Sequence, residues 1–160
     1  MKSGAPHDGA ASKSQKADVK RLIFILSLAI ILPCFGSVPG HQSEREAKEF
    51  SQKVAESFLP LLDAQKYSAS WEFLSPLAKE TLSKRNWIYG LAKLRQPLGK
   101  LKSRKLLETK YINPLPGYPD QEGALVRFES HFNNGKTVIE SVGTIRDKDG
   151  IWRVGAYMKN

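Results

Sequence analysis

Five polar residues in the C-terminal half of the chain have types and spacings suited to chemistry. Glu129 and His131 are two residues apart, so both point to one face of a strand, with Arg127 beside them. Glu140 and Arg153 are expected to approach that face from neighbouring strands. A carboxylate beside a histidine can form a general acid–base pair. The same row is typical of the solvated face of an antiparallel sheet, so a solvated row is our first interpretation and a ligand pocket the second.

Other catalytic and metal-binding signatures are missing from the sequence. The chain has one cysteine, Cys34, and beyond residue 40 its histidines are His41 and His131. No HExxH motif, glycine-rich phosphate loop or GxSxG elbow occurs. We therefore expect no metal and no cofactor, and we expect a protein that is not an enzyme. The alternative is a small pocket enzyme that uses Glu129 and His131 as its acid–base pair.

Positive charge is concentrated in one segment of the chain. The net charge is +9, and residues 79–110 hold ten basic residues against two acidic ones. An ordinary solvated helix face is one interpretation, and binding to an anionic envelope lipid is the other. The candidate residues for an anionic surface are Lys84, Arg85, Lys93, Arg95, Lys100, Lys102, Arg104 and Lys105.

The apolar run of residues 22–35 predicts the cellular location of the domain. It follows Lys20 and Arg21 directly and ends in small residues up to Gly40, the order of an export signal. The run is shorter than the roughly 20 residues of a spanning helix. Cleavage after Gly40, cleavage after Gly36 and retention as an inner-membrane anchor all remain open. A lipoprotein signal at Cys34 is disfavoured, because Leu32 and Pro33 precede it.

The leader divides the chain into three parts. Residues 1–21 are expected to be a disordered basic n-region, residues 22–40 the signal or anchor, and residues 41–160 a single domain. The only cysteine falls in the leader, so the core of the domain must form without disulfides. An exported domain facing the periplasm is not expected to bind nucleic acid. Its expected partners are an anionic envelope lipid or an envelope protein, with a homodimer through the open sheet face as a further option.

Helical periodicity dominates the first half of the domain. A capping-box pattern at Ser43 precedes an apolar stripe that repeats every three or four residues. A short second helix is expected to follow, and Ser75 and Pro76 can start another turn. A third helix is expected over residues 83–96. The first stripe comprises Ala47, Phe50, Val54, Phe58, Leu61 and Leu62, and that of the third helix comprises Trp87, Leu91 and Leu94.

From Leu101 onward the apolar period changes to two, which predicts strands. We expect them over residues 103–111, 123–132, 136–146 and 151–159. Asn133, Asn134 and Gly135 predict a hairpin, because Asn and Gly adopt positive φ readily. The fold class is therefore α+β, with three N-terminal helices packed on a curved four-stranded antiparallel meander.

Several of these elements together resemble a known family, the exported bacterial family of domain of unknown function 4019. The resemblance covers nearly all of residues 45–160, although the family usually ends in Trp-Arg-Val-x-Gly-Tyr and this chain has its glycine one position early, at Gly155. It implies no catalytic residues. The helices-then-meander order also resembles the nuclear-transport-factor-2-like and cystatin-like architectures. The residues that carry the family resemblance are Trp71, Pro97-Leu98-Gly99, Arg104, Leu115-Pro116-Gly117, Phe128, Phe132, Glu140 and Gly150 to Val154.

The sequence therefore predicts an exported cell-envelope domain without catalytic activity. Such a domain is expected to bind a ligand, a lipid surface or a protein partner.

Overall fold

The computed structural model describes residues 39–160, with side chains from Ser43 onward. The predicted n-region and nearly all of the predicted signal or anchor lie outside these described residues. Among the helices of the described part, none is both long and apolar enough to cross a membrane.

The long helix α1 (Pro39–Asp63) forms one side of the core. It begins at Pro39, four residues before Ser43, so the predicted capping box lies inside the helix rather than at its start. Proline is favoured in the first turn of a helix, where its missing N–H costs nothing. Pro60 also lies within α1 and does not end it. The buried stripe of α1 is Ala47, Ser51, Ala55, Phe58, Leu59 and Leu62.

The end of α1 is a Schellman motif. The backbone N–H of Gln65 donates to the carbonyl of Leu62 (3.1 Å), and that of Lys66 donates to the carbonyl of Leu61 (2.7 Å). Gln65 takes the left-handed conformation that this motif requires, with φ of 57°. Glycine is the usual residue there, because a side chain makes this conformation costly.

Short helices connect α1 to the sheet. They are α2 (Tyr67–Ser70), the 3₁₀ turn η1 (Trp71–Phe73), α3 (Pro76–Thr81), α4 (Lys84–Arg95) and the 3₁₀ turn η2 (Gln96–Leu98). Ser75 and Ser83 cap α3 and α4 by accepting hydrogen bonds from the N–H groups of Ala78 and Asn86. The turn predicted at Ser75 is therefore present. The described residues hold four α-helices rather than the three that the sequence predicted.

The inner stripe of α4 differs from the prediction at one position. Trp87 and Leu91 are buried as expected, but Leu94 is 38% exposed and Arg95 is buried instead. Residues 87, 91 and 95 follow one another at four-residue steps, which keeps them on one face of the helix. Arg95 is therefore an inward-facing charge.

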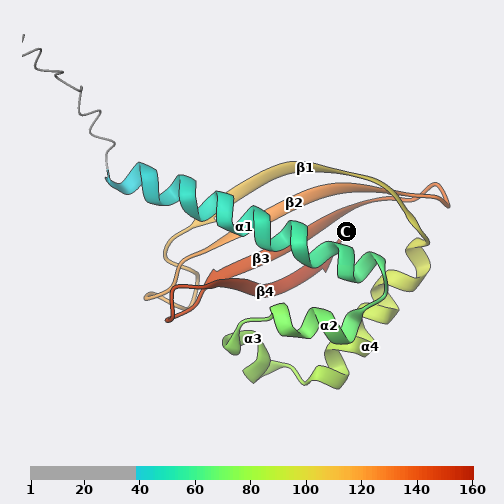
Figure 1. The fold of residues 1–160 in the computed structure, drawn as a ribbon, viewed down its shortest axis with the longest axis horizontal. Coiled ribbons are helices and arrows are strands. Elements are labelled where there is room, and N and C mark those ends of the chain that lie inside the picture. The colour runs from blue at the N-terminus through green and yellow to red at the C-terminus, as the bar shows by residue number, and fades with distance from the viewer. Residues whose placement is uncertain (1–38) are drawn as a thin grey trace, which may run out of the picture. The chain divides into compact units, whose positions relative to one another are not determined.

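The second half of the domain is the predicted antiparallel meander. Its strands are β1 (Leu101–Ile112), β2 (Gly123–Phe132), β3 (Thr137–Arg146) and β4 (Trp152–Lys159), and they lie in the sheet in chain order. Figure 1 shows α1 lying across the sheet, with the shorter helices α2, α3 and α4 grouped beyond β4. The fold is α+β.

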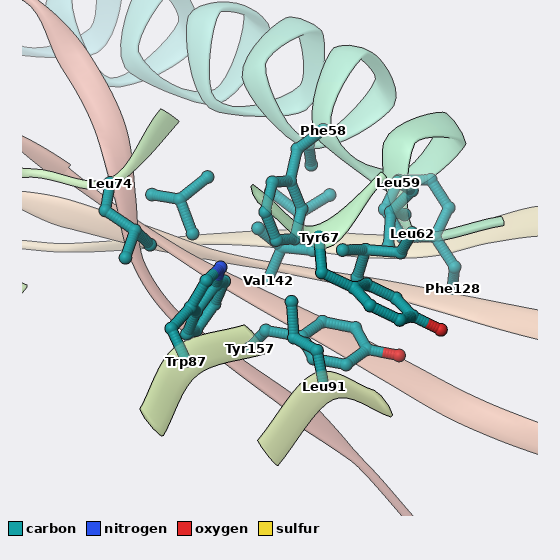
Figure 2. Close-up of a cluster of buried hydrophobic side chains, with 13 residues drawn as sticks. Phe58, Leu59, Leu62, Tyr67, Leu74, Trp87, Leu91, Phe128, Val142 and Tyr157 are labelled. Carbon is teal, nitrogen blue, oxygen red and sulfur yellow. The ribbon is translucent and has the colours of Figure 1, made fainter. Parts of the chain in front are cut away.

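The core lies between α1, the short helices and the inner face of the sheet. Phe58 is at its centre. The centroid of its ring lies 6.2 Å from that of Trp87 and 6.1 Å from that of Tyr157. Figure 2 shows these aromatic side chains together with the aliphatic residues that surround them. On β2, Val126, Phe128 and Phe132 face inward as predicted.

Candidate functional site

Four charged side chains from four different elements meet at one edge of the core. Asp63 is the last residue of α1, Arg95 the last of α4, Arg104 lies on β1, and Glu140 lies on β3. Arg95 is 5% exposed and Glu140 is fully buried. We call these four residues, with Ser130 and Tyr157, the charge cluster. It brings two guanidinium groups against two carboxylates in a place where unpaired charge is very costly.

Glu140 accepts hydrogen bonds at both carboxylate oxygens. Its Oε1 accepts from Arg95 and from the hydroxyl of Tyr157 (2.6 Å). Its Oε2 accepts from Nε and Nη2 of Arg104 (3.0 and 2.6 Å) and from the hydroxyl of Ser130. The buried carboxylate therefore has donors on all sides, as a charge in a protein interior requires.

Asp63 is held by the same two arginines. Its Oδ2 accepts from Nη1 of Arg104 (2.8 Å), and its Oδ1 accepts from Nη2 of Arg104 (2.9 Å) and from Arg95. Two nearly parallel bonds from one guanidinium give a planar, bidentate pair with a fixed geometry. The Asp63 side chain remains 18% exposed, so it lies at the solvent edge of the cluster.

The register of the sheet explains why these residues share a face. Arg104 pairs with Ser130 across β1 and β2, and Glu140 pairs with Phe128 across β2 and β3. Directly paired residues on antiparallel strands point to the same side. Because Phe128 faces the helices, Glu140 must face them as well.

Contacts within the cluster shift the pKa values of three of its members. Burial lowers the pKa of Arg95, but the nearby Tyr157, Glu140 and Asp63 raise it by more, so the net shift is upward. Burial likewise lowers the pKa of Arg104, and Asp63 and Glu140 reverse that effect. Burial and the charge of Glu140 raise the pKa of the Tyr157 hydroxyl. At neutral pH the arginines are charged and Tyr157 keeps its proton.

A polar pocket opens beside the cluster, where the end of α1, the start of α2, and the η2–β1 junction meet. Its volume is about 410 Å³. Asp63 and Arg95 lie in its wall, and Lys100, the residue before β1, is exposed to solvent. We call it the Tyr67 pocket; its lining residues are Leu62, Asp63, Gln65, Tyr67, Arg95, Gln96, Gly99 and Lys100.

Tyr67 is the unusual member of this lining. The residue is 7% exposed, and its hydroxyl has no hydrogen-bond partner in the described part of the chain. Figure 2 shows its hydroxyl pointing out of the apolar cluster in the same direction as that of Tyr157. Burial raises the pKa of this hydroxyl, and the charge of Arg95 partly opposes the shift. Burying a hydroxyl without a hydrogen-bond partner costs free energy, and an acceptor atom of a bound ligand recovers part of that cost.

The backbone of the pocket is tightly specified at two places. Gln65, which lines the pocket, has the left-handed backbone conformation. Gly99 has φ of 79°, and a Cβ at this residue would lie 2.7 Å from Oδ1 of Asn133. Gly99 therefore permits the close approach of the β2–β3 hairpin.

Further concavities occur among the described residues, and two of them are relevant to the charge cluster and to the predicted stripe of α1. One of about 200 Å³ lies between α1 and the sheet, with Arg104 and Glu56 in its wall. The other, of about 480 Å³, lies between the first half of α1 and the start of β4 and is mostly apolar. Phe50 lines it and is 52% exposed, which corrects the prediction that Phe50 belongs to the buried stripe.

The five polar residues predicted as one group are distributed over three places. Glu129 and His131 do lie together on the open sheet face, with Nε2 of His131 3.1 Å from Oε1 of Glu129. Arg127 on the same strand pairs instead with Glu108 (2.7 Å). The side chains of Glu129 and His131 are partly exposed, at 38% and 44%.

The other two members lie elsewhere, which corrects the predicted grouping. Glu140 is on the opposite, helix-covered face, because it pairs with Phe128 rather than with Glu129. Arg153 forms ion pairs with Asp147 (2.7 Å) and Asp149 (2.8 Å) in the turn before β4.

The predicted basic surface is also divided by the structure. Arg95 and Arg104 are taken into the charge cluster, and Lys84 pairs with Glu72 (3.0 Å). Lys105 pairs in register with Glu129 on the open sheet face. The other exposed cations of the predicted surface are thus spread over α4, the η2–β1 junction and the sheet; they are Arg85, Lys93, Lys100, Lys102 and Lys105.

Within residues 39–160, no group of three or more histidine, cysteine or acidic side chains is placed to hold a metal ion.

Two residues of the site, Asp63 and Tyr67, were not predicted from the sequence. The four-residue spacing from Trp87 to Leu91 to Arg95 was a usable signal for the inward arginine, but apolar character favoured Leu94.

Comparison with known proteins gives one family match. The family model described as "Protein of unknown function (DUF4019)" matches residues 54–157. This range contains the whole charge cluster and the whole Tyr67 pocket. The predicted family resemblance is confirmed. No curated protein matches the chain.

Proposed function

The chain belongs to the DUF4019 family of proteins of unknown function, and from its site we propose that it is an exported, non-catalytic cell-envelope domain that binds a small polar ligand in the Tyr67 pocket. The observation that carries this proposal is the Tyr67 hydroxyl. This hydroxyl is buried and has no partner among the described residues, and Tyr67 lines an open polar pocket. Buried hydroxyls normally have partners, so a ligand or a water that a ligand replaces is the natural acceptor.

The charge cluster supports a binding role because it makes the pocket wall rigid. Arg95 and Asp63 belong both to the cluster and to the wall. Their side chains are fixed by hydrogen bonds to Arg104, Glu140 and each other. A site whose groups are already ordered loses less entropy when it binds a ligand.

The same pairing argues against catalysis at this place. Each carboxylate of the cluster is engaged by two arginines, so neither is an available general base. Catalytic groups instead need a proton affinity near the working pH and access to substrate. Glu129 and His131 lie on the other face of the sheet and share no wall with the Tyr67 pocket.

Export is supported by the leader sequence. The basic residues Lys20 and Arg21, the apolar run of residues 22–35 and the small residues up to Gly40 stand in the order of a signal. The domain that follows contains no cysteine. An envelope location places the Tyr67 pocket in contact with periplasmic solutes.

Two measurements on the same cells test the proposal. Fractionation of a C-terminally tagged chain, with N-terminal sequencing of the accumulated form, is expected to give a periplasmic or membrane fraction. The purified protein is then screened by thermal unfolding against neutral, anionic and cationic small molecules. We expect at least one class of molecule to raise the midpoint of thermal unfolding of the wild type. The same molecules should raise the midpoint of Lys100→Gln by less. A cytoplasmic protein, or a flat screen across all classes, would overturn the proposal.

A further inference from the structure

We infer that the ligand of the Tyr67 pocket is a small carboxylate, an inference that rests on the proposed binding function. The first argument is charge. Arg95 and Arg104 balance Asp63 and Glu140 within the cluster. Lys100 lies in the pocket wall outside this balance and is exposed. The lining therefore carries one positive charge in excess.

Asp63 is an acid in the pocket wall, yet it does not make the site repel anions. Both of its oxygens accept hydrogen bonds from arginine. Its negative charge is met by two guanidinium groups at hydrogen-bonding distance, and such close pairs have little net field beyond a few ångströms. The excess charge of Lys100 then sets the sign of the potential in the pocket.

The second argument is the kind of hydrogen bond that the pocket can offer. The Tyr67 hydroxyl is a donor without an acceptor among the described residues. Gln65 and Gln96 also line the pocket, and a glutamine side chain can donate N–H hydrogen bonds. A carboxylate is an acceptor at both oxygens and can use an O–H, an amide N–H and an ammonium group together.

The third argument is size. A volume of about 410 Å³ falls in the lower part of the roughly 300–1,000 Å³ range of small-molecule sites. A short organic acid fits this volume. A folded protein or a bilayer does not enter it, so the inferred ligand is a diffusible solute.

The test is a titration of the isotope-labelled protein, isolated in the form that accumulates in cells. The probes are sodium acetate, sodium succinate, inorganic phosphate, glycerol and choline chloride, each at constant ionic strength. NMR signals of Tyr67, Gln65 and Lys100 report on the pocket. Signals of Glu129 and His131 report on the open sheet face and serve as an internal control.

Three variants separate binding from folding. Tyr67→Phe removes only the unpartnered hydroxyl, Lys100→Gln removes the excess charge, and Lys110→Gln is the matched control, an exposed lysine on β1 outside the pocket. We expect acetate or succinate to bind. Tyr67→Phe should weaken this binding about tenfold and Lys100→Gln about two- to fivefold. Lys110→Gln should leave it unchanged.

The unliganded stability of Tyr67→Phe distinguishes a ligand contact from a structural one. Because the hydroxyl has no partner, its removal should leave the thermal midpoint unchanged or raise it. A clear fall in the midpoint would show that the hydroxyl stabilises the fold, and would overturn the inference.

The other outcomes are equally decisive. Binding of glycerol or choline at Tyr67 without binding of acetate or succinate would overturn the carboxylate inference and leave the binding function standing. Phosphate binding much tighter than either carboxylate would do the same. If no probe moves the Tyr67 signals, the carboxylate inference fails, and the broader thermal screen then decides the proposed function.

Discussion

Arg95, at the end of α4, and Glu140, in the middle of β3, form an ion pair that is closed to solvent. The two residues are 45 positions apart in the chain, so the pair fixes the helical half of the domain to the sheet. Because Arg95 also lines the Tyr67 pocket, the pair connects the stability of the fold to the geometry of the site.

The first prediction concerns the loss of Glu140. Glu140→Ala leaves Arg95 and Arg104 with one carboxylate between them in a buried place. We expect the free energy of unfolding to fall by about 3–5 kcal/mol, the range for breaking a buried charge pair. Urea unfolding measures it. Glu108→Ala, which breaks the exposed pair with Arg127, is the control and should cost at most about 1 kcal/mol. Equal effects in the two variants would contradict the role of the cluster.

The second prediction concerns the left-handed residue at the end of α1. Gln65→Gly removes the side chain from a conformation that disfavours one, so we expect the free energy of unfolding to rise by about 0.5–1 kcal/mol. Gly99→Ala is the opposite case, because its new Cβ meets Asn133, and it should lower stability by more than about 1 kcal/mol. Thermal and urea unfolding check both. A destabilised Gln65→Gly would mean that the Gln65 side chain makes stabilising contacts.

The third prediction is a loss of stability in alkali. Burial and Glu140 raise the pKa of Tyr157 above its ordinary value of 10.0. The unfolded chain therefore releases this proton at a lower pH than the folded chain, and between the two values the folded state binds more protons. Stability is thus full below about pH 10 and falls as the pH rises further.

Urea unfolding between about pH 9 and about pH 11 measures this loss. Tyr157→Phe should show a shallower slope, although it is less stable at neutral pH because Glu140 and Arg95 each lose a partner. An identical alkaline slope in wild type and variant would contradict the assignment to Tyr157.

The fourth prediction concerns the exposed pair on the open sheet face. Replacing Glu129 and His131 together by glutamine should change the free energy of unfolding by less than about 1 kcal/mol, because polar pairs at the protein surface contribute little. Ligand-dependent thermal shifts should also remain unchanged. A variant that lost every such shift would instead favour the alternative, a site built on these two residues.

Local patterns in the sequence were sufficient for most of the fold. Period-two alternation located all four strands to within about two residues, and Asn133 to Gly135 marked the hairpin, where Gly135 has φ of 82°. These features depend on nearest neighbours in the chain.

The site could not be predicted in this way because it depends on register and on distant contacts. The face that Glu140 occupies follows from its pairing with Phe128, and a shift by one residue would have placed it beside Glu129. The inward position of Arg95 is stabilised by Asp63 and Glu140, which are 32 and 45 residues away. Tyr67 was not among the predicted site residues, and only the fold shows that its hydroxyl has no partner among the described residues.

The most direct test of the binding function is to observe the Tyr67 ring during a titration of the wild-type protein. Labelled tyrosine gives this ring its own NMR signals, and acetate and succinate are the first probes. We predict that the Tyr67 signals and the Lys100 amide shift together and saturate, while the signals of Glu129 and His131 stay fixed. Movement of the His131 signals with no change at Tyr67 would contradict the assignment of the binding site to this pocket.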